Sequence, residues 1–214
     1  MCAEPRAAIP LYLMAKAPRA GQVKTRMRPE LNAETAARLA RLMLEQTVEN
    51  ACRHWPGEVA LCIWPRAGHP AFTRLAAKHQ LAVTVQADTD LGGRMLAALD
   101  RGIARAGGAA VMGCDVPHCP GEVLAAAHAL LARGENPVGA AEDGGFYLLG
   151  LRRADAALFD GVRWSGPEVL DAVRARAAAA GVRLRDLPPL RDIDRYCDLQ
   201  WLAGVDAAYQ PFLD

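Results

Sequence analysis

Residues 11–29 read LYLMAKAPRAGQVKTRMRP, an apolar run that passes directly into a basic loop. The apolar part has the length and composition of a buried β-strand. The loop contains a glycine and five basic residues: Lys16, Arg19, Lys24, Arg26 and Arg28. In an open α/β sheet, ligands bind just beyond the carboxyl ends of strands. The stretch therefore predicts a site for a polyanionic ligand, although a solvated basic loop would also explain the charges.

Apolar runs alternate with amphipathic helical patterns along the rest of the chain. We predict strands at residues 9–15, 58–65, 81–87, 109–115, 136–141, 145–151 and 182–188. Helices are predicted over residues 32–52, 92–107, 120–134 and 166–181, with Asn32 as the N-cap of the first. A further helix is expected to start within residues 192–199, with Asp192 or Asp194 as its N-cap. This order is typical of an α/β protein with three layers, a mostly parallel sheet between two layers of helices.

The size and charge of the chain exclude several classes of protein. Its 214 residues fit a single domain with a sizeable core. The formal net charge is +1 and the basic residues are scattered, so we expect neither a nucleic acid nor a membrane as partner. No run approaches the roughly 20 apolar residues that span a bilayer, and residues 1–10 contain no signal-like segment. We therefore expect a cytoplasmic protein, as a monomer or a homodimer.

The six cysteines form no C-x-x-C pair, which is typical of reduced thiols. Cys114, His118 and Cys119 could be imagined as a zinc site, but a structural zinc usually draws on two separated ligand pairs. None of the five histidines lies in a nucleophile arrangement. Cys114 is expected to pack in a strand rather than to serve as a catalytic thiol.

Acidic residues follow two of the predicted strands. Asp115 ends the apolar part of AAVMGCDVP (residues 109–117). A carboxylate there could bind Mg²⁺ or Mn²⁺ together with substrate phosphates, or it could cap the following turn. In AEDGGFYLLG (residues 141–150), the Asp-Gly-Gly triplet has the composition of a tight turn between strands. The sequence leaves open whether these residues form turns, a site or both.

Six separated blocks of the sequence occur in an order that resembles a known family. They are AKAPRAGQVKTRMRPEL, DLGGRMLAAL, GCDVP, AEDGGFYLLGL, WSGPEVL and DIDRYCDL. Together they resemble the small bacterial transferases of the DUF2064 type, related to 2-phospholactate guanylyltransferase. That family belongs to the nucleotide-diphospho-sugar transferase superfamily, so the resemblance implies the glycosyltransferase-A fold. It extends over most of the chain, from about residue 11 to residue 199.

The resemblance implies that the two halves of the chain bind different substrates. Residues 1–117 would form the nucleotide-binding half of the single domain, and residues 118–214 the acceptor side. The nucleotide-binding residues would be Lys16, Arg19, Gly21, Lys24, Thr25, Arg26, Gln86, Gly92 and Arg94. KTRMRP (residues 24–29) is similar to the G-T-R-x-x-P end of the loop in sugar nucleotidyltransferases, but has Lys24 in place of the glycine.

Two further groups of residues receive roles only through the resemblance. The metal, Mg²⁺ or Mn²⁺, would be held by Asp115 and Asp194, and catalysis would rest on Lys24, Arg26 and Asp115. The acceptor would contact Glu142, Asp143, Gly144, Gly145 and Trp164. From the residues alone, Gly92 could simply begin a helix and Trp164 could equally pack beneath the sheet.

Together with the residue pattern, the resemblance implies a metal-dependent transferase that uses a nucleotide. We favour nucleotidyl transfer from a nucleoside triphosphate to a small acceptor, because the basic loop suits a triphosphate. Glycosyl transfer from an NDP-sugar is the alternative, although the chain has CDV where many glycosyltransferases have D-x-D. A nucleotide-binding protein without turnover and a purely structural partner protein are the remaining readings.

Overall fold

The computed structural model describes residues 8–65, 68–164 and 166–213; residues 1–7, where we predict no signal segment, lie outside the described part. These residues form one seven-stranded sheet with the order β3-β2-β1-β4-β6-β5-β7. The strands are β1 (Leu11–Lys16), β2 (Val59–Trp64), β3 (Ala82–Val85), β4 (Ala109–Gly113), β5 (Asn136–Ala141), β6 (Phe146–Leu151) and β7 (Leu184–Leu190). All neighbouring pairs are parallel except those that β6 makes with β4 and β5. The predicted mostly parallel sheet is confirmed.

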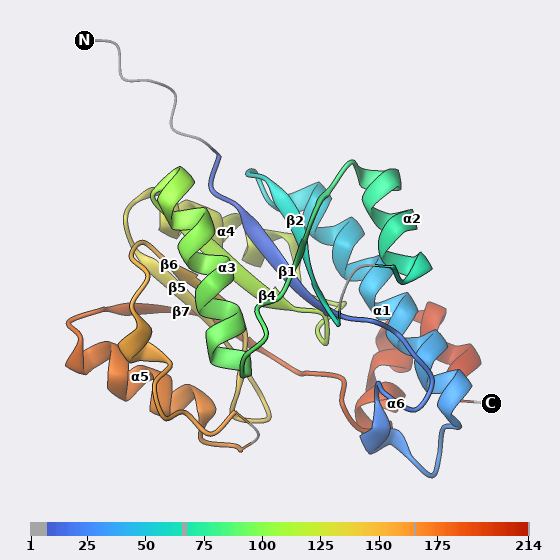
Figure 1. Ribbon diagram of the computed structural model, residues 1–214. Coiled ribbons are helices and arrows are strands. Elements are labelled where there is room, and N and C mark those ends of the chain that lie inside the picture. The colour runs from blue at the N-terminus through green and yellow to red at the C-terminus, as the bar shows by residue number, and fades with distance from the viewer. Residues whose placement is uncertain (1–7, 66–67, 165, 214) are drawn as a thin grey trace.

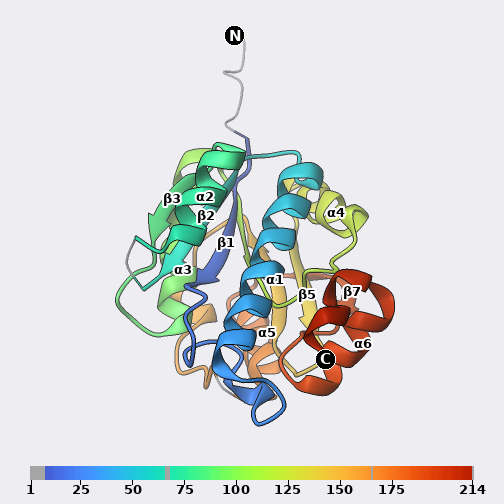
Figure 2. The same ribbon diagram turned by 90° about the vertical axis from the view of Figure 1, so that its right-hand side faces the viewer.

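Helices cover both faces of this sheet (Figures 1 and 2). The helices are α1 (Ala33–His54), α2 (Pro70–His79), α3 (Leu91–Ala106), α4 (Gly121–Ala132), α5 (Val169–Ala179) and α6 (Tyr196–Val205). Three short 3₁₀ helices are η1 (Thr25–Met27), η2 (Ala156–Leu158) and η3 (Ala207–Phe212). Helices α1, α2 and α4 lie on one face, and α3 and α5 on the other. In the part of the chain that the structure describes, no helix is both long enough and apolar enough to span a membrane.

The period of two along β1 explains how the layers are held together. Leu11 and Leu13 point toward the α1 side, where they join one buried cluster with Leu44. Tyr12 points the other way and packs in a second cluster with Leu99 of α3. The strand is thus apolar on both faces, as expected for the centre of a parallel sheet covered by helices. The predicted three-layer α/β fold is confirmed.

Helix α2 was not predicted from the sequence. The pattern gave no prediction for α2, a helix of ten residues that follows the end of β2. Pro70 stands in its first turn, and His69 caps it through Nδ1, which accepts a hydrogen bond of 3.3 Å from the backbone N–H of Ala71. Proline early in a helix is a start signal, but histidine is not among the usual N-cap residues.

The start of α6 corrects a prediction. Its N-cap is Arg195 rather than Asp192 or Asp194. Asp198 lies in the first turn, and its Oδ2 accepts hydrogen bonds from two backbone N–H groups that precede the helix, those of Asp194 (3.2 Å) and Arg195 (2.8 Å). A capping carboxylate inside the first turn replaces one before it. The side chains of Asp192 and Asp194 are therefore available for other contacts. By contrast, Asn32 caps α1 as predicted.

After β7, residues 191–195 form a crossing segment that leads to the opposite side of the molecule, where α6 and η3 pack against α1 (Figure 1). This third apolar cluster includes Leu39 and Met43 of α1 together with Ile193 from the crossing segment. The backbone N–H of Ile193 donates a 2.9 Å hydrogen bond to the carbonyl oxygen of Asp115. The crossing segment is thereby fixed beside the end of β4, so Asp194 lies close to Asp115.

Candidate functional site

The basic loop after β1 folds back toward α1 through two left-handed residues. Gly21 has a φ of 76° and Lys24 a φ of 47°. Glycine adopts this region freely, whereas it is uncommon for other residues. Met27, the last residue of η1, is completely buried in the cluster beneath α1. The anchored turn places the Lys24 side chain inside the protein rather than in solvent.

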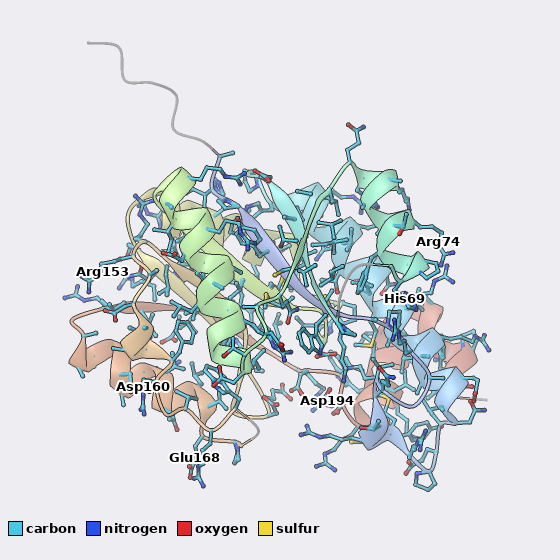
Figure 3. The ribbon with its side chains drawn as sticks, viewed as in Figure 1. His69, Arg74, Arg153, Asp160, Glu168 and Asp194 are labelled. Atoms are coloured by element: carbon cyan, nitrogen blue, oxygen red, sulfur yellow. The ribbon has the colours of Figure 1, made fainter. Side chains whose placement is uncertain are left out.

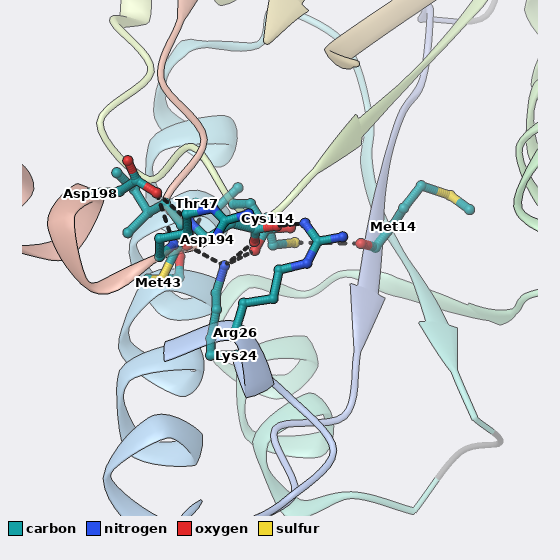
Figure 4. Close-up of polar contacts among 11 residues, drawn as sticks. Met14, Lys24, Arg26, Met43, Thr47, Cys114, Asp194 and Asp198 are labelled. Atoms are coloured by element: carbon teal, nitrogen blue, oxygen red, sulfur yellow. Dashed lines mark hydrogen bonds and ion pairs between the residues drawn. The ribbon is translucent and has the colours of Figure 1, made fainter. Parts of the chain in front are cut away.

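The Lys24 ammonium lies at the centre of the site (Figure 4). Its Nζ donates to Oδ1 of Asp115, to the carbonyl oxygen of Ile193 at 2.6 Å and to Oδ1 of Asp194 at 3.2 Å. Only 6% of the side chain is exposed. Burial opposes the positive charge, but the Asp115 and Asp194 carboxylates outweigh it, so the pKa of Lys24 lies above its ordinary value. The amine is therefore a fully bonded ammonium.

Asp194 also contacts Arg26, whose Nη1 lies 2.9 Å from Oδ2 of the carboxylate. Figure 3 places Asp194 between the part of the molecule that carries α3 and α5 and the part that carries α1 and α6. Asp115 is the more accessible of the two acids, with 56% of its side chain exposed against 30% for Asp194. The structure thus brings together four predicted site residues from three distant segments of the chain.

Two cavities meet at this cluster. The smaller, of about 250 Å³, lies between the basic loop and α1 and is lined by Lys16, Lys24 and Thr25. The larger, of about 820 Å³, is lined by Glu142, Asp143, Gly145 and Trp164 among others. The residues that line both cavities are Met14, Arg26, Cys114, Asp115 and Asp194. The paired carboxylates therefore stand between a basic cavity and a roomier cleft.

The larger cleft has an acidic wall. Glu142 is paired with Arg191 at 3.0 Å. Burial, followed by the charge of Asp143, raises the pKa of Asp192 to about 6. We did not predict Asp192 or Arg191 as site residues. The sequence Asp-Ile-Asp could have indicated Asp192 as a site residue. Side chains alternate in an extended chain, so Asp192 and Asp194 lie on one side, toward the cleft, and the buried Ile193 lies on the other.

The acidic turn after β5 is both a turn and part of this wall. Gly144 has a φ of 92°, and its carbonyl oxygen accepts a 2.9 Å hydrogen bond from the backbone N–H of Leu170 in α5. A Cβ atom at this position would lie 1.8 Å from the carbonyl oxygen of Pro167. Asp143 holds the turn by accepting a 2.8 Å hydrogen bond from the N–H of Gly145. The glycine is required by close approach as well as by its backbone angle.

Five residues predicted to bind the nucleotide line neither cavity: Arg19 and Gly21 of the basic loop, and Gln86, Gly92 and Arg94. The buried Gln86 donates a 2.8 Å hydrogen bond to the carbonyl oxygen of Cys62. Arg94 stacks on the Trp64 ring, with Cζ 3.7 Å from its centroid. Gly92 packs against Trp164, which both lines the larger cleft and stacks on Phe159. Their nucleotide-binding roles stay predictions, as do those of the residues that line the basic cavity.

Asp115 and Asp194 fit a divalent metal by the chemistry of their donors. Together with the Ile193 carbonyl, they direct three oxygen atoms at one point. Mg²⁺ typically takes one or two carboxylates and completes its octahedron with water and substrate phosphates. Among the described residues, no three His, Cys, Asp or Glu side chains are grouped closely enough to hold a metal. Burial raises the pKa of Cys114 to about 12, which leaves no reactive thiolate.

Comparison with known proteins gives one family and many similar structures. A family profile described as "Uncharacterized protein conserved in bacteria (DUF2064)" matches residues 47–166. A provisionally assigned nucleotide-diphospho-sugar transferase from Desulfovibrio desulfuricans G20 is 26% identical, with a TM-score of 0.84, and the match covers 93% of this chain and 87% of that chain. Among curated proteins, none matches the chain.

Two more distant structures share the fold. The CMP:2-keto-3-deoxy-manno-octonic acid synthetase complexed with CTP is 12% identical, with a TM-score of 0.58 over 94% of this chain and 99% of that chain. Rv0371c from Mycobacterium tuberculosis H37Rv, in complex with manganese, is 19% identical, with a TM-score of 0.57 over 94% of this chain and 100% of that chain. At this level of identity, the likeness shows the fold alone.

Proposed function

The chain belongs to the bacterial family described as DUF2064, and from its site we propose that it is a metal-dependent transferase that uses a nucleotide. The favoured reaction is nucleotidyl transfer from a nucleoside triphosphate to a small acceptor. The observation that carries the proposal is the position of Asp115 and Asp194 between the two cavities. One cavity offers cations for phosphates, and the other offers space for an acceptor.

The basic cavity suits the phosphates of a nucleotide. Lys16 and Arg26 face it with exposed side chains, and Thr25 adds a hydroxyl group. Arg can bind two phosphate oxygens through paired donors, and Lys acts as a point charge. Phosphoryl-type transfer depends chiefly on positioning and on neutralising charge, and these groups supply both. Arg19 lies in the same loop but outside the cavity lining.

In the proposed reaction, a hydroxyl oxygen of the acceptor attacks the α-phosphorus of the triphosphate. The new oxygen–phosphorus bond forms as the bond to pyrophosphate breaks, and the hydroxyl proton passes to solvent. Arg26 and the loop lysines would neutralise the leaving pyrophosphate, while the wall containing Glu142 and Asp143 would position the acceptor. A metal held by Asp115 and Asp194 would supply further positive charge to the phosphates. The manganese complex of the structurally similar Rv0371c supports a divalent metal.

The test is pyrophosphate release from a panel of nucleoside triphosphates with Mg²⁺ or Mn²⁺, measured in the presence of candidate hydroxyl acceptors. Asp115→Asn keeps the size of the side chain but removes its charge, and we expect it to lower the rate by about 100-fold or more. Asp186→Asn is the matched control, because Asp186 lies on β7 and pairs with Arg174 away from the cavities. Activity that survives Asp115→Asn would remove this carboxylate from the mechanism.

Glycosyl transfer from an NDP-sugar is the second candidate, and the 26% identity to the Desulfovibrio protein favours it. Both reactions would use the same basic cavity, so they differ in the bond that breaks and in the product released. An NDP-sugar that stabilises the protein more than its bare diphosphate, and that releases NDP, would favour glycosyl transfer. Tight nucleotide binding without either product would instead indicate a binding protein, and the absence of any nucleotide binding would leave a structural role.

A further inference from the structure

Lys24 occupies the position where the proposed metal ligands converge. Its three N–H donors are met by three oxygens, those of Asp115, Asp194 and the Ile193 carbonyl. These are the same oxygens that would face a divalent cation. With 6% of its side chain exposed, the ammonium is enclosed rather than loosely associated. The protein therefore carries its own cation at the centre of the site.

A second observation concerns the backbone. Lys24 has φ 47° and ψ 36°, a left-handed conformation that side chains disfavour and glycine does not. The loop thus keeps a glycine-type conformation at a position occupied by lysine. This conformation leads the side chain inward to the two carboxylates (Figure 4). The strain is consistent with a specific task for the amine, because strained residues concentrate at functional sites.

We propose that Lys24 competes with the divalent metal for these three oxygens, so that the free protein binds the metal only when the lysine side chain is displaced. The proposal rests on the proposed function for the identity of the metal site. A metal ion and an ammonium in contact with the same carboxylate oxygens would repel each other strongly in this enclosed position. Lys24 also lines the basic cavity. Phosphate groups bound there would give the displaced ammonium new partners.

The test is Mn²⁺ binding to the nucleotide-free protein, followed by the electron paramagnetic resonance signal of free Mn²⁺. Lys24→Gly removes the ammonium and suits the left-handed backbone, while Lys24→Met removes the charge and the N–H donors but keeps most of the side chain. We expect both variants to bind Mn²⁺ about tenfold more tightly than the wild type, within the usual range of coupling between sites. Lys78→Met is the matched control, because Lys78 forms an exposed ion pair with Glu49, and it should bind Mn²⁺ like the wild type.

The site of the Mn²⁺ is checked by adding Asp115→Asn to Lys24→Gly, which should abolish the gain in affinity. Equal or weaker Mn²⁺ binding by both Lys24 variants would overturn the proposal, provided that circular dichroism shows them folded. A gain that survives in the double variant would also overturn it, because the ion would then bind elsewhere. Failure of the proposed function looks different: tight Mn²⁺ binding by the variants, with no pyrophosphate or NDP released by the wild type.

Discussion

Asp192 offers a direct test of the electrostatics of the larger cleft. Burial and the neighbouring charge of Asp143 raise its pKa from 3.8 to about 6. The carboxylate therefore costs folding free energy whenever it is ionised in the native protein. Asp192→Asn removes the charge with almost no change of shape. We expect the substitution to stabilise the protein at pH 8 and to have little effect at acidic pH.

The magnitude follows from the two pKa values. At 1.36 kcal/mol per pH unit, the difference between 3.8 and about 6 corresponds to about 3 kcal/mol. The side chain is only half-buried and solvent screens part of the interaction, so we expect about 1 to 2 kcal/mol. Below pH 4 the carboxyl is protonated in both folded and unfolded chains and contributes nothing. Between pH 4 and 6 the folded chain holds the extra proton, so this group lowers stability as pH rises, and above pH 6 the full cost applies.

The assay is urea-induced unfolding of wild type and Asp192→Asn between pH 4 and pH 8. The difference in the free energy of unfolding should grow with pH through this window and then level off. Asp100→Asn on the exposed surface of α3 is the control for removing an acidic charge from the protein. A difference that is independent of pH, or a variant less stable than the wild type at pH 8, would refute the assignment of an unfavourable charge to Asp192.

Two glycine substitutions test the close contacts around the cleft. Gly144→Ala brings a Cβ atom to 1.8 Å from the Pro167 carbonyl oxygen and should destabilise by about 2 to 4 kcal/mol in urea unfolding. Gly134→Ala also has a positive φ but meets no atom within 4 Å, so it should cost only about 1 kcal/mol, and equal losses would show that the Pro167 contact is unimportant. Gly92→Ala places a Cβ atom 2.4 Å from the Trp164 ring and should shift tryptophan fluorescence while destabilising by about 1 to 3 kcal/mol. Gly204→Ala, in the open surface of α6, should instead be neutral or slightly stabilising, and an unchanged fluorescence spectrum for Gly92→Ala would count against the packing of Trp164 on α3.

The fold could be predicted because its signals are local. Most strands are short runs rich in Val, Ile, Leu and Ala, although β7 (LRDLPPL) contains Arg185, Asp186 and two prolines. Each of the four predicted helices has apolar residues at helical spacing over a greater length, with proline or glycine near its ends. The errors occurred where a single side chain replaces the usual signal. His69 caps α2 in place of a typical capping residue, and Asp198 of α6 bonds the N–H of the N-cap residue Arg195 from inside the helix.

The site could be predicted only in part, because its geometry depends on contacts between distant segments. The residue types suggested phosphate binding for Lys24 and either metal binding or capping for Asp115, and the family resemblance added Asp194 as a metal ligand. No spacing indicates that Lys24 bonds both carboxylates. That contact depends on the left-handed backbone at Lys24 and on the path of the crossing segment. The hydrogen bond from Lys24 to the Ile193 carbonyl involves a backbone atom, so the identity of the side chain at position 193 does not predict it.

Two features that are unfavourable on their own lie at the junction of the cavities or beside it. Lys24 holds a backbone conformation in which glycine would be less strained, and Asp192 carries a charge that its surroundings disfavour. The ion pairs of Lys24 offset its backbone strain, but a chain selected for stability alone would favour asparagine at position 192. Unfavourable features that concentrate in one cleft are better explained by ligand binding than by folding. If Asp192→Asn stabilises the protein while lowering its transferase activity, then the charge of Asp192 is retained for function at the expense of stability. Tighter Mn²⁺ binding by Lys24→Gly would place the strained residue in the same site. Stabilisation without any functional loss would separate Asp192 from the acceptor and confine the site to the basic loop and the paired carboxylates.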